Sequence, residues 1–437
     1  MTPISIPWPK IYVDLVSGGN TEKSAIMAAR QLERDIFLDG WPVGQVFADR
    51  PELVRRYGFG RGTLIEAIRL LENRGVARMR RGPGGGLVVM AVPRLQVKQV
   101  LIDYFRASRV TPAQLHEARR VFAVTADYVA AVRSGEEALT SFFADWRAAL
   151  QAADVNDPLG KTRSAINDRI LSADPFVGLF AETLDDLAEL SSASGRAGRG
   201  GKHHGQAGRA HKRSLALQIR ELLEDEIQRK AILDDRLGTE EEICARLGTS
   251  RHVLRQAIRV LENQGVVESQ RGRSRGLVAG TPKIAAAVET LIAYLSSAGI
   301  HYEDVNPARQ IMARLTRVLV MAKATTDQQQ EFQRLVHYGH TWRGTGMFNS
   351  WIRLDWGIID NPVLSVMAQA LTGYRMRTSN DHCSIPVEGS ASIQRTLEKY
   401  INAATRRDFS GADDLFENIL KKIKGSFSPA RQQQPGV

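Results

Sequence analysis

One stretch of the chain is present twice, and this duplication constrains the fold more than any other feature of the sequence. Residues 57–89 align without a gap to residues 247–279, each residue lying 190 positions after its counterpart. About half of the aligned positions are identical. A repeat of this kind predicts that one structural unit occurs twice in the chain.

Each copy of the repeat predicts a helix with one apolar face. Gly60 in the first copy and Ser250 in the second occupy the position of a helix N-cap, which both residue types tolerate. The helix should begin at the following arginine and end at an Asn-x-Gly sequence, whose glycine provides a left-handed stop. Leucine and isoleucine recur on one face of this helix. The opposite face carries Arg61, Ile65 and Arg69 in the first copy, and Arg251, Arg255 and Arg259 in the second.

Two short segments follow the helix in each copy. They are separated by RGPGGG at residues 81–86 or by RGRSRG at residues 271–276, which predicts a β-hairpin with a basic, glycine-rich tip. A short helix, a tight turn, a second helix and a hairpin are typical of a winged helix-turn-helix, whose second helix enters the DNA major groove. The alternative is a helix and hairpin with a solvated basic face, but recurrence of the whole arrangement favours DNA binding.

Both copies resemble the DNA-binding domain of GntR-type bacterial transcription regulators, whose recognition segment reads G-x-S-R-x-x-V-R-E-A-L-x-x-L-E-x-x-G. The second copy retains both arginines of this pattern at Arg251 and Arg255, whereas Ile65 replaces the second arginine in the first copy. The family's preceding P-S-E-R-E-L segment is altered in both copies: its arginine is displaced to Arg50 in one and replaced by an acid in the other. The resemblance and the basic hairpin imply DNA contacts at Arg50, Arg61, Thr63, Ile65, Arg69, Arg81, Gly82, Arg251, His252, Arg255, Arg259, Arg271, Gly272 and Arg273.

The composition agrees with a soluble nucleic-acid-binding protein. The chain has 437 residues, 43% of them hydrophobic, and a net charge of +11, which suits a polyanionic partner. Two cysteines form neither a disulfide framework nor a zinc spacing, and Cys244 is expected to pack as a small apolar residue in the helix before its turn. No signal region or long apolar run occurs, so we expect a cytoplasmic, nucleoid-associated protein without membrane contact.

Each copy of the repeat is followed by a helical region. Residues 96–190 and 284–425 both read as a succession of amphipathic helices. They resemble the all-helical effector-binding domain of the FadR-like branch of GntR regulators, the FCD type. The first region is shorter, because family members have two further helices where it stops. The predicted fold is therefore mainly α, with two winged helix-turn-helix domains, each followed by an FCD-like bundle, the first of them truncated.

One segment between the two halves has the composition of a linker. Glycine, alanine, serine and basic residues dominate it, without an apolar period, which predicts a flexible basic tether. Its three histidines have no acid or cysteine beside them and do not indicate a metal site. The predicted domains are an N-terminal arm (1–20), a first winged helix (21–92), a first helical domain (96–190), the linker (191–213), a second winged helix (214–280), a second helical domain (284–425) and a disordered tail (426–437).

The sequence predicts no metal, no cofactor and no enzymatic activity. Metal-binding members of the resembled branch carry one aspartate and three histidines, and the corresponding positions here fall at Phe348, Ile352, Leu397 and Ile419. His337 and His340 lie three positions apart and could share a metal, but two histidines on a helix surface are the preferred interpretation. No nucleophile elbow or phosphate loop occurs, and the glycines of residues 82–86 do not lead into a helix.

These features together predict a sequence-specific regulator that binds double-stranded DNA through two reading heads in one chain. Two alternatives stay open: a non-specific architectural DNA-binding protein, and an interaction scaffold that has lost DNA binding. The sequence leaves open whether a small-molecule effector exists, and whether the chain pairs as a homodimer or as an intrachain pseudo-dimer.

Overall fold

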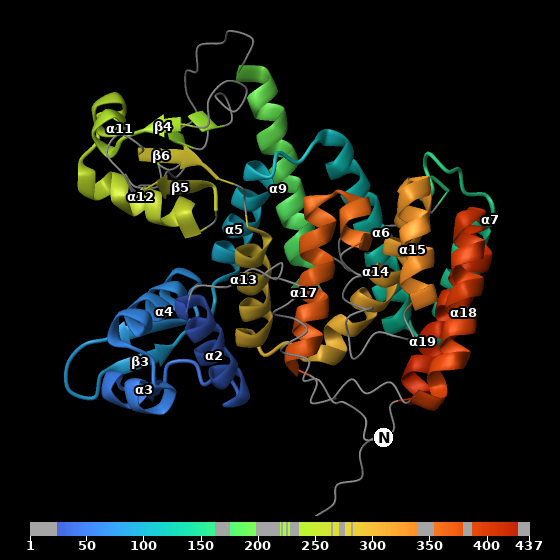
Figure 1. Ribbon diagram of the computed structural model, residues 1–437, viewed down its shortest axis with the longest axis horizontal. Helices are drawn as coiled ribbons and strands as arrows, with labels where there is room; N and C mark the ends of the chain where they lie inside the picture. Colours follow the sequence, from blue (N-terminus) through green and yellow to red (C-terminus); the bar gives the residue numbers. More distant parts are fainter. Residues whose placement is uncertain are drawn as a thin grey trace, which may run out of the picture. The chain divides into compact units, whose positions relative to one another are not determined.

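The structure of the chain is a computed structural model. It describes residues 24–161, 175–197, 219, 222–223, 226–227, 236–263, 265–270, 276–280, 283–338, 354–378 and 387–426. The predicted N-terminal arm, most of the predicted linker and the C-terminal tail lie outside the described residues. The described chain is mainly helical and contains two small antiparallel sheets, which confirms the predicted mainly α class (Figure 1).

The chain divides into two compact units that do not follow the order of the sequence. One unit combines residues 22–115 with residues 179–300, and we call it the hairpin unit because it holds both sheets. The other combines residues 116–178 with residues 301–437, and we call it the helical unit. The expected linear succession of domains therefore differs from the compact units, because each unit draws on both halves of the chain.

The first module of the hairpin unit is built from three helices and three strands. Its core contains leucines and an isoleucine contributed by all three helices and by β3, and every one of them is at most 1% exposed: Leu32, Ile36, Leu53, Leu64, Leu71 and Leu87. The strands form an antiparallel sheet in the order β1-β3-β2, in which Ala77 pairs with Val89. The elements are α2 (Ser24–Leu38), β1 (Val46–Ala48), α3 (Arg50–Tyr57), α4 (Arg61–Asn73), β2 (Ala77–Arg80) and β3 (Gly86–Val89).

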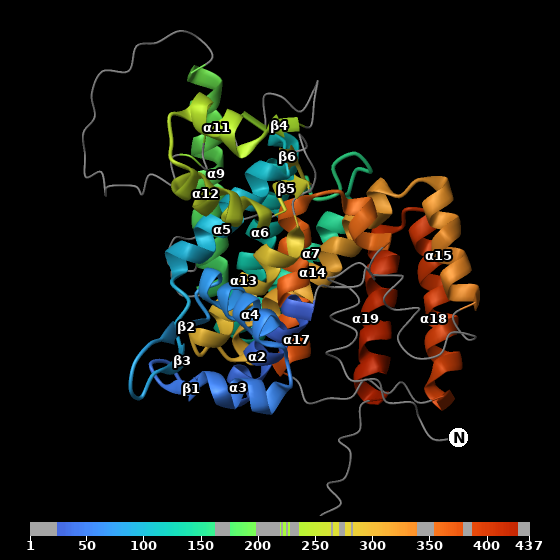
Figure 2. The same cartoon turned by 60° about the vertical axis from the view of Figure 1, so that its left-hand side comes forward.

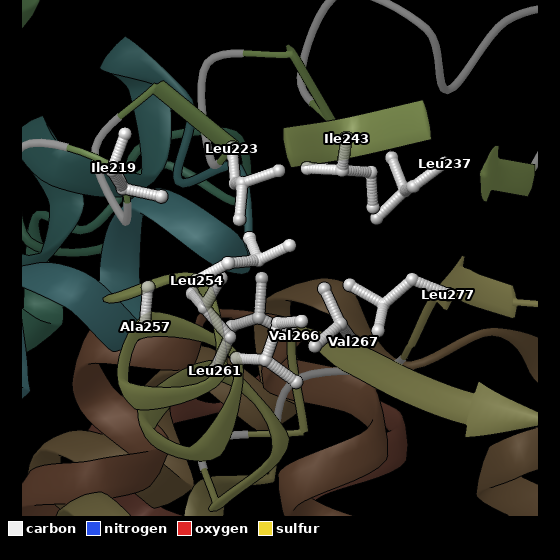
Figure 3. Close-up of a cluster of buried hydrophobic side chains, with 11 residues drawn as sticks. Ile219, Leu223, Leu237, Ile243, Leu254, Ala257, Leu261, Val266, Val267 and Leu277 are labelled. Carbon is white, nitrogen blue, oxygen red and sulfur yellow. The ribbon is translucent and has the colours of Figure 1, made fainter. Parts of the chain in front are cut away.

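The second module repeats this order. Its sheet has the order β4-β6-β5, and Val267 pairs with Ala279, each 190 positions after its counterpart in the first module. Figure 3 shows its core, in which Ile243 of α11, Leu254 of α12 and Leu277 of β6 pack together. Cys244 is half-buried against this core, as predicted. The elements are β4 (Arg236–Gly238), α11 (Glu240–Leu247), α12 (Arg251–Asn263), β5 (Val267–Gln270) and β6 (Gly276–Ala279).

Three longer helices complete the hairpin unit: α5 (Arg94–Ala107), α13 (Ile284–Ser297) and most of α9 (Pro175–Ala197). The helices α5 and α13 follow the first and second module directly, and they contact each other (Figure 1). The side-chain oxygen of Ser297 accepts from the backbone N of Val92 at 3.0 Å, which fixes the end of α13 beside the start of α5. The helix α9 runs on to Ala197, into the segment expected to be linker, since no proline stops it there.

A buried ion network connects α13 to the first module. Arg30 of α2 donates to Glu289 of α13 at 2.5 Å, and Arg74 at the end of α4 bonds to the other carboxylate oxygen of Glu289. The second terminal nitrogen of Arg74 lies 3.3 Å from Glu33 of α2. The four side chains are between 0% and 10% exposed, and their charges sum to zero. Buried charges are tolerated only when paired in this way.

The helical unit contains most of the helices that follow each module. Figure 2 shows α18 and α19 side by side, and α14 packs on α17 and α19. Two of its ion pairs join residues far apart in the sequence: Arg317 with Asp355 at 2.6 Å, and Arg314 with Glu417 at 2.6 Å. The helices are α6 (Pro112–Ser134), α7 (Glu136–Gln151), α14 (Tyr302–Lys323), α15 (Thr326–Tyr338), α17 (Pro362–Thr378), α18 (Val387–Thr405) and α19 (Phe409–Ser426).

Candidate nucleic-acid interface

The helices α4 and α12 begin in the same way, immediately after a glycine turn. The preceding helices α3 and α11 end at Gly58 and Gly248, whose φ angles are 64° and 62°. In this left-handed region glycine is the favoured residue. Ser250 accepts from the backbone N of Val253 at 3.4 Å and caps α12, as predicted, whereas Gly60 precedes α4 without a side-chain cap. Both helices therefore present their first backbone N–H groups at an exposed end, where anions bind favourably.

Burial divides each of these helices into two faces. Four matching apolar positions in each helix are at most 4% exposed: Leu64, Ala67, Ile68 and Leu71 in α4, and Leu254, Ala257, Ile258 and Leu261 in α12. The predicted contact residues lie on the exposed faces, with Thr63 partly buried: Arg61, Ile65 and Arg69 in α4, and Arg251, His252 and Arg255 in α12. Arg259 lies in α12, but its side chain is outside the described residues.

The exposed cations of the first module are mostly unpaired. Within the described part of the chain, neither Arg50 nor Arg61 has a hydrogen-bond or ion-pair partner. Arg69 forms an exposed pair with Glu66 at 3.5 Å. Ile65 is 37% exposed, so its aliphatic side chain meets solvent on the face where the second module has Arg255. Arg50 and Arg61 can therefore bind an anion without first breaking an ion pair.

The two described arginines on the exposed face of α12 are paired with acids of α11. Arg251 donates to Glu241 at 3.1 Å, and Arg255 donates through Nε to both oxygens of Glu240 at 3.1 and 3.0 Å. The hydrogen bond to Glu240 raises the pKa of Arg255, which stays fully protonated. His252 and Gln256 are joined through their side chains at 3.1 Å. The sequence predicts an acid in this segment but not the two ion pairs, for which the three successive glutamates in the first turn of α11 were the available signal.

The hairpin tip of the first module is shaped by its glycines. Arg80 donates to the carbonyl of Gly84 at 2.7 Å, and Gly82 has a φ angle of 99°, a conformation that side chains disfavour. Arg81 is exposed beside it, where it can approach a phosphate. Glu72 of α4 accepts from the backbone N of Met79 at 2.9 Å and fixes the hairpin to the helix. In the second module Arg271, Gly272 and Arg273 lie outside the described residues.

The described residues of the helical unit include few of the positions tested for metal ligands. Leu397 is half-buried, Ile419 is 4% exposed, and His337 is exposed on α15. Phe348, Ile352, His340 and His382 lie outside the described residues. Across the described ranges, no three histidine, cysteine or acidic residues come together as a metal site would require. None of the helices described is both long and apolar enough to cross a bilayer.

Comparison with known proteins gives one family match. Residues 215–276 match the model of the gntR family of bacterial regulatory proteins, which supports a GntR-type, DNA-binding transcription regulator. No curated protein matches the sequence. Among solved structures, Streptococcus agalactiae GntR is similar at 18% identity and a TM-score of 0.33, covering 49% of this chain and 100% of that chain. A GntR protein from Rhodococcus sp. RHA1 is similar at 17% identity and a TM-score of 0.22, with the same coverage.

Proposed function

We propose that this chain is a sequence-specific transcription regulator whose two modules are winged helix-turn-helix heads that read DNA from one polypeptide. The observation that carries the proposal is the exposed pair Arg251 and Arg255, one turn apart at the start of α12, inside the segment that matches the gntR family. An arginine at this place in a recognition helix can pair with the O6 and N7 atoms of guanine. The first module supports a second head, because it repeats the same elements in the same order.

The two heads are proposed to differ in what they read. Arg255 can donate two hydrogen bonds to guanine, whereas Ile65 at the matching position can only pack against a thymine methyl group. The second head should therefore recognise a stronger half-site, and the first a more A·T-tolerant one. Because both heads are on one chain, the weaker contact benefits from a high effective concentration. The expected binding site is an imperfect palindrome or a strong half-site beside a degenerate one.

We further propose that the two heads pair within one chain. The contact between α5 and α13, and the bonds from Glu289 to Arg30 and Arg74, support this pairing because they join the helix after the second head to the first head. The helical regions are proposed to be FCD-like and to respond to a small-molecule effector. Their resemblance to that branch supports this, and the effector's identity is left open.

A DNA-binding measurement on the full-length chain tests the proposal. A duplex selected from a random pool by the wild-type protein is compared with a scrambled duplex of the same composition. Arg255→Ala should weaken binding to the selected duplex by roughly 1–3 kcal/mol and relax preference at one base pair. Equal loss on both duplexes would favour the alternative, a non-specific architectural protein, because it would make Arg255 a phosphate contact only.

A further inference from the structure

The first turn of α11 places three successive glutamates beside the recognition helix of the second module. Glu242 caps its own helix, since its carboxylate accepts from the backbone N of Thr239 at 2.8 Å. Glu240 and Glu241 have a different role, because their carboxylates bond to Arg255 and Arg251 of α12. Two of the three acids therefore act on the residues proposed to read DNA.

The two ion pairs use different edges of the guanidinium groups. Glu240 holds Arg255 through Nε alone, at 3.0 and 3.1 Å, and the terminal nitrogens of Arg255 have no partner in the described structure. These terminal nitrogens are available to pair with guanine. Glu241 instead occupies a terminal nitrogen of Arg251 at 3.1 Å, so a DNA group has to displace it.

The acids are specific to the second module. Their counterparts 190 positions earlier are Arg50 and Pro51, which carry no negative charge. Arg50 and Arg61 have no ion-pair partner within the described ranges. The first module thus presents unpaired cations at the start of its recognition helix, whereas the second presents cations with their charge locally neutralised.

This difference affects non-specific and specific binding unequally. Non-specific affinity for DNA comes from the attraction between cations and phosphates, and an adjacent carboxylate offsets that attraction. All four side chains are between 38% and 83% exposed, and exposed ion pairs of this kind contribute little free energy. A bidentate contact with guanine is strong enough to compensate for breaking one of these ion pairs. A single contact with phosphate contributes too little to do so.

We propose that Glu240 and Glu241 are specificity-determining residues of the second head, which keep Arg255 and Arg251 from binding phosphate wherever guanine is not offered. The proposal rests on the proposed function, because it assumes that α12 enters the major groove. It explains why two acids lie beside the proposed DNA-reading arginines, a place where negative charge weakens attraction to DNA. The acids lower affinity for random sequence and thereby increase the ratio between specific and non-specific binding.

Full-length wild-type protein and the Glu240→Gln/Glu241→Gln variant test this inference by titration over a range of salt concentrations. The probes are the duplex selected by the wild-type chain and a random-sequence duplex of equal length. On the random duplex, the double variant should bind on the order of tenfold more tightly, with a slope of log affinity against log salt steeper by about one to two units. On the selected duplex the affinity should rise less than threefold, so that selectivity falls.

Two further variants separate the possible outcomes. Glu331→Gln breaks an exposed ion pair of α15 in the helical unit and gives the effect of losing one negative charge outside the recognition module. The double variant removes two negative charges and Glu331→Gln removes one. If the double variant raises the logarithm of affinity for the random duplex by no more than twice the rise in Glu331→Gln, the proposed role of Glu240 and Glu241 in specificity is wrong. Arg255→Ala tests the proposed function itself. If this variant loses selectivity while the double variant keeps it, the second head reads DNA without help from the acids.

Discussion

The buried carboxylate of Glu289 offers a sharp test of how the hairpin unit is held together. Glu289 is 1% exposed and bonds to Arg30 and Arg74, which are 10% and 7% exposed. In the Glu289→Gln variant the side chain keeps its shape but loses its charge, so two buried guanidinium groups lose a shared carboxylate, while Arg74 keeps its pair with Glu33. Removing one partner of a buried ion pair costs about 3–5 kcal/mol. We therefore expect a loss near the lower limit, because the amide still accepts a hydrogen bond.

Hydrogen–deuterium exchange of the full-length chain measures this loss locally, which avoids assuming that a chain of two units unfolds in one step. Some amides of α13 and of the end of α4 exchange only when the network opens. For these amides, a stability loss of about 3 kcal/mol corresponds to about a hundredfold faster exchange. Glu182→Gln is the matched control in the same unit. Glu182 is 53% exposed and pairs with Arg94 at 2.9 Å, so its loss should cost less than about 1 kcal/mol.

A double variant shows whether charge is responsible. Gln264 lies 190 positions after Arg74, and Gln99 lies 190 positions before Glu289. The repeat therefore carries two uncharged glutamines at the positions that correspond to this charged pair. Arg74→Gln/Glu289→Gln should therefore be less destabilised than the sum of the two single variants, by about 1–3 kcal/mol. If Glu289→Gln exchanges no faster than Glu182→Gln, the network does not hold α13 on the first module, and the proposed pairing within one chain loses its main support.

Three further predictions concern other parts of the chain. Burial raises the pKa of Asp355 from 3.8 to about 7, so the folded chain retains a proton that the unfolded chain releases between these values. The contribution of this group to stability is therefore fully present below pH 4 and is lost as the pH rises to 7. Asp355→Asn should flatten this pH dependence of the melting temperature. Elemental analysis of tag-free protein should find no stoichiometric transition metal, and about one zinc, nickel or manganese per chain would contradict this. Ile65→Arg should raise the preference of the first head for a guanine-containing half-site in a selection from random duplexes, and an unchanged selected sequence would show that this position does not read DNA.

Much of each module could be predicted because its signals are local. The helix from Arg61 to Asn73 and the helix from Arg251 to Asn263 have the predicted bounds, since capping residues and glycines mark both ends. Gly75 and Gly265 adopt φ angles of 72° and 74°, the left-handed conformation expected of a helix stop. The exposed faces of both helices also follow from their apolar period.

The contacts across the sequence could not be predicted in the same way. Glu289 meets Arg30 across 259 positions, and no local pattern indicates which distant charges become buried together. The pairing of Arg255 with Glu240 spans only 15 positions, but it depends on the angle between two helices, which periodicity does not determine. The extension of α9 to Ala197 was missed because a glycine-, serine- and alanine-rich segment reads as a linker, although alanine and arginine favour helix.

The differences between the two halves indicate how the proposed heads pair. In a symmetric dimer of identical chains, a contact between two residues occurs twice, once in each direction. The bond between Glu289 and Arg74 cannot have a reciprocal ion pair in this chain, because the corresponding residues are the uncharged Gln99 and Gln264. If two copies of the second half paired with each other, Glu289 would face Gln264 and its buried charge would have no arginine from that position. Such burial is costly, so the charges favour a first half paired with a second half over two like halves. Fusion of the two halves in one chain removes the requirement for symmetry, so the two proposed heads are free to differ in the residues that they present to DNA.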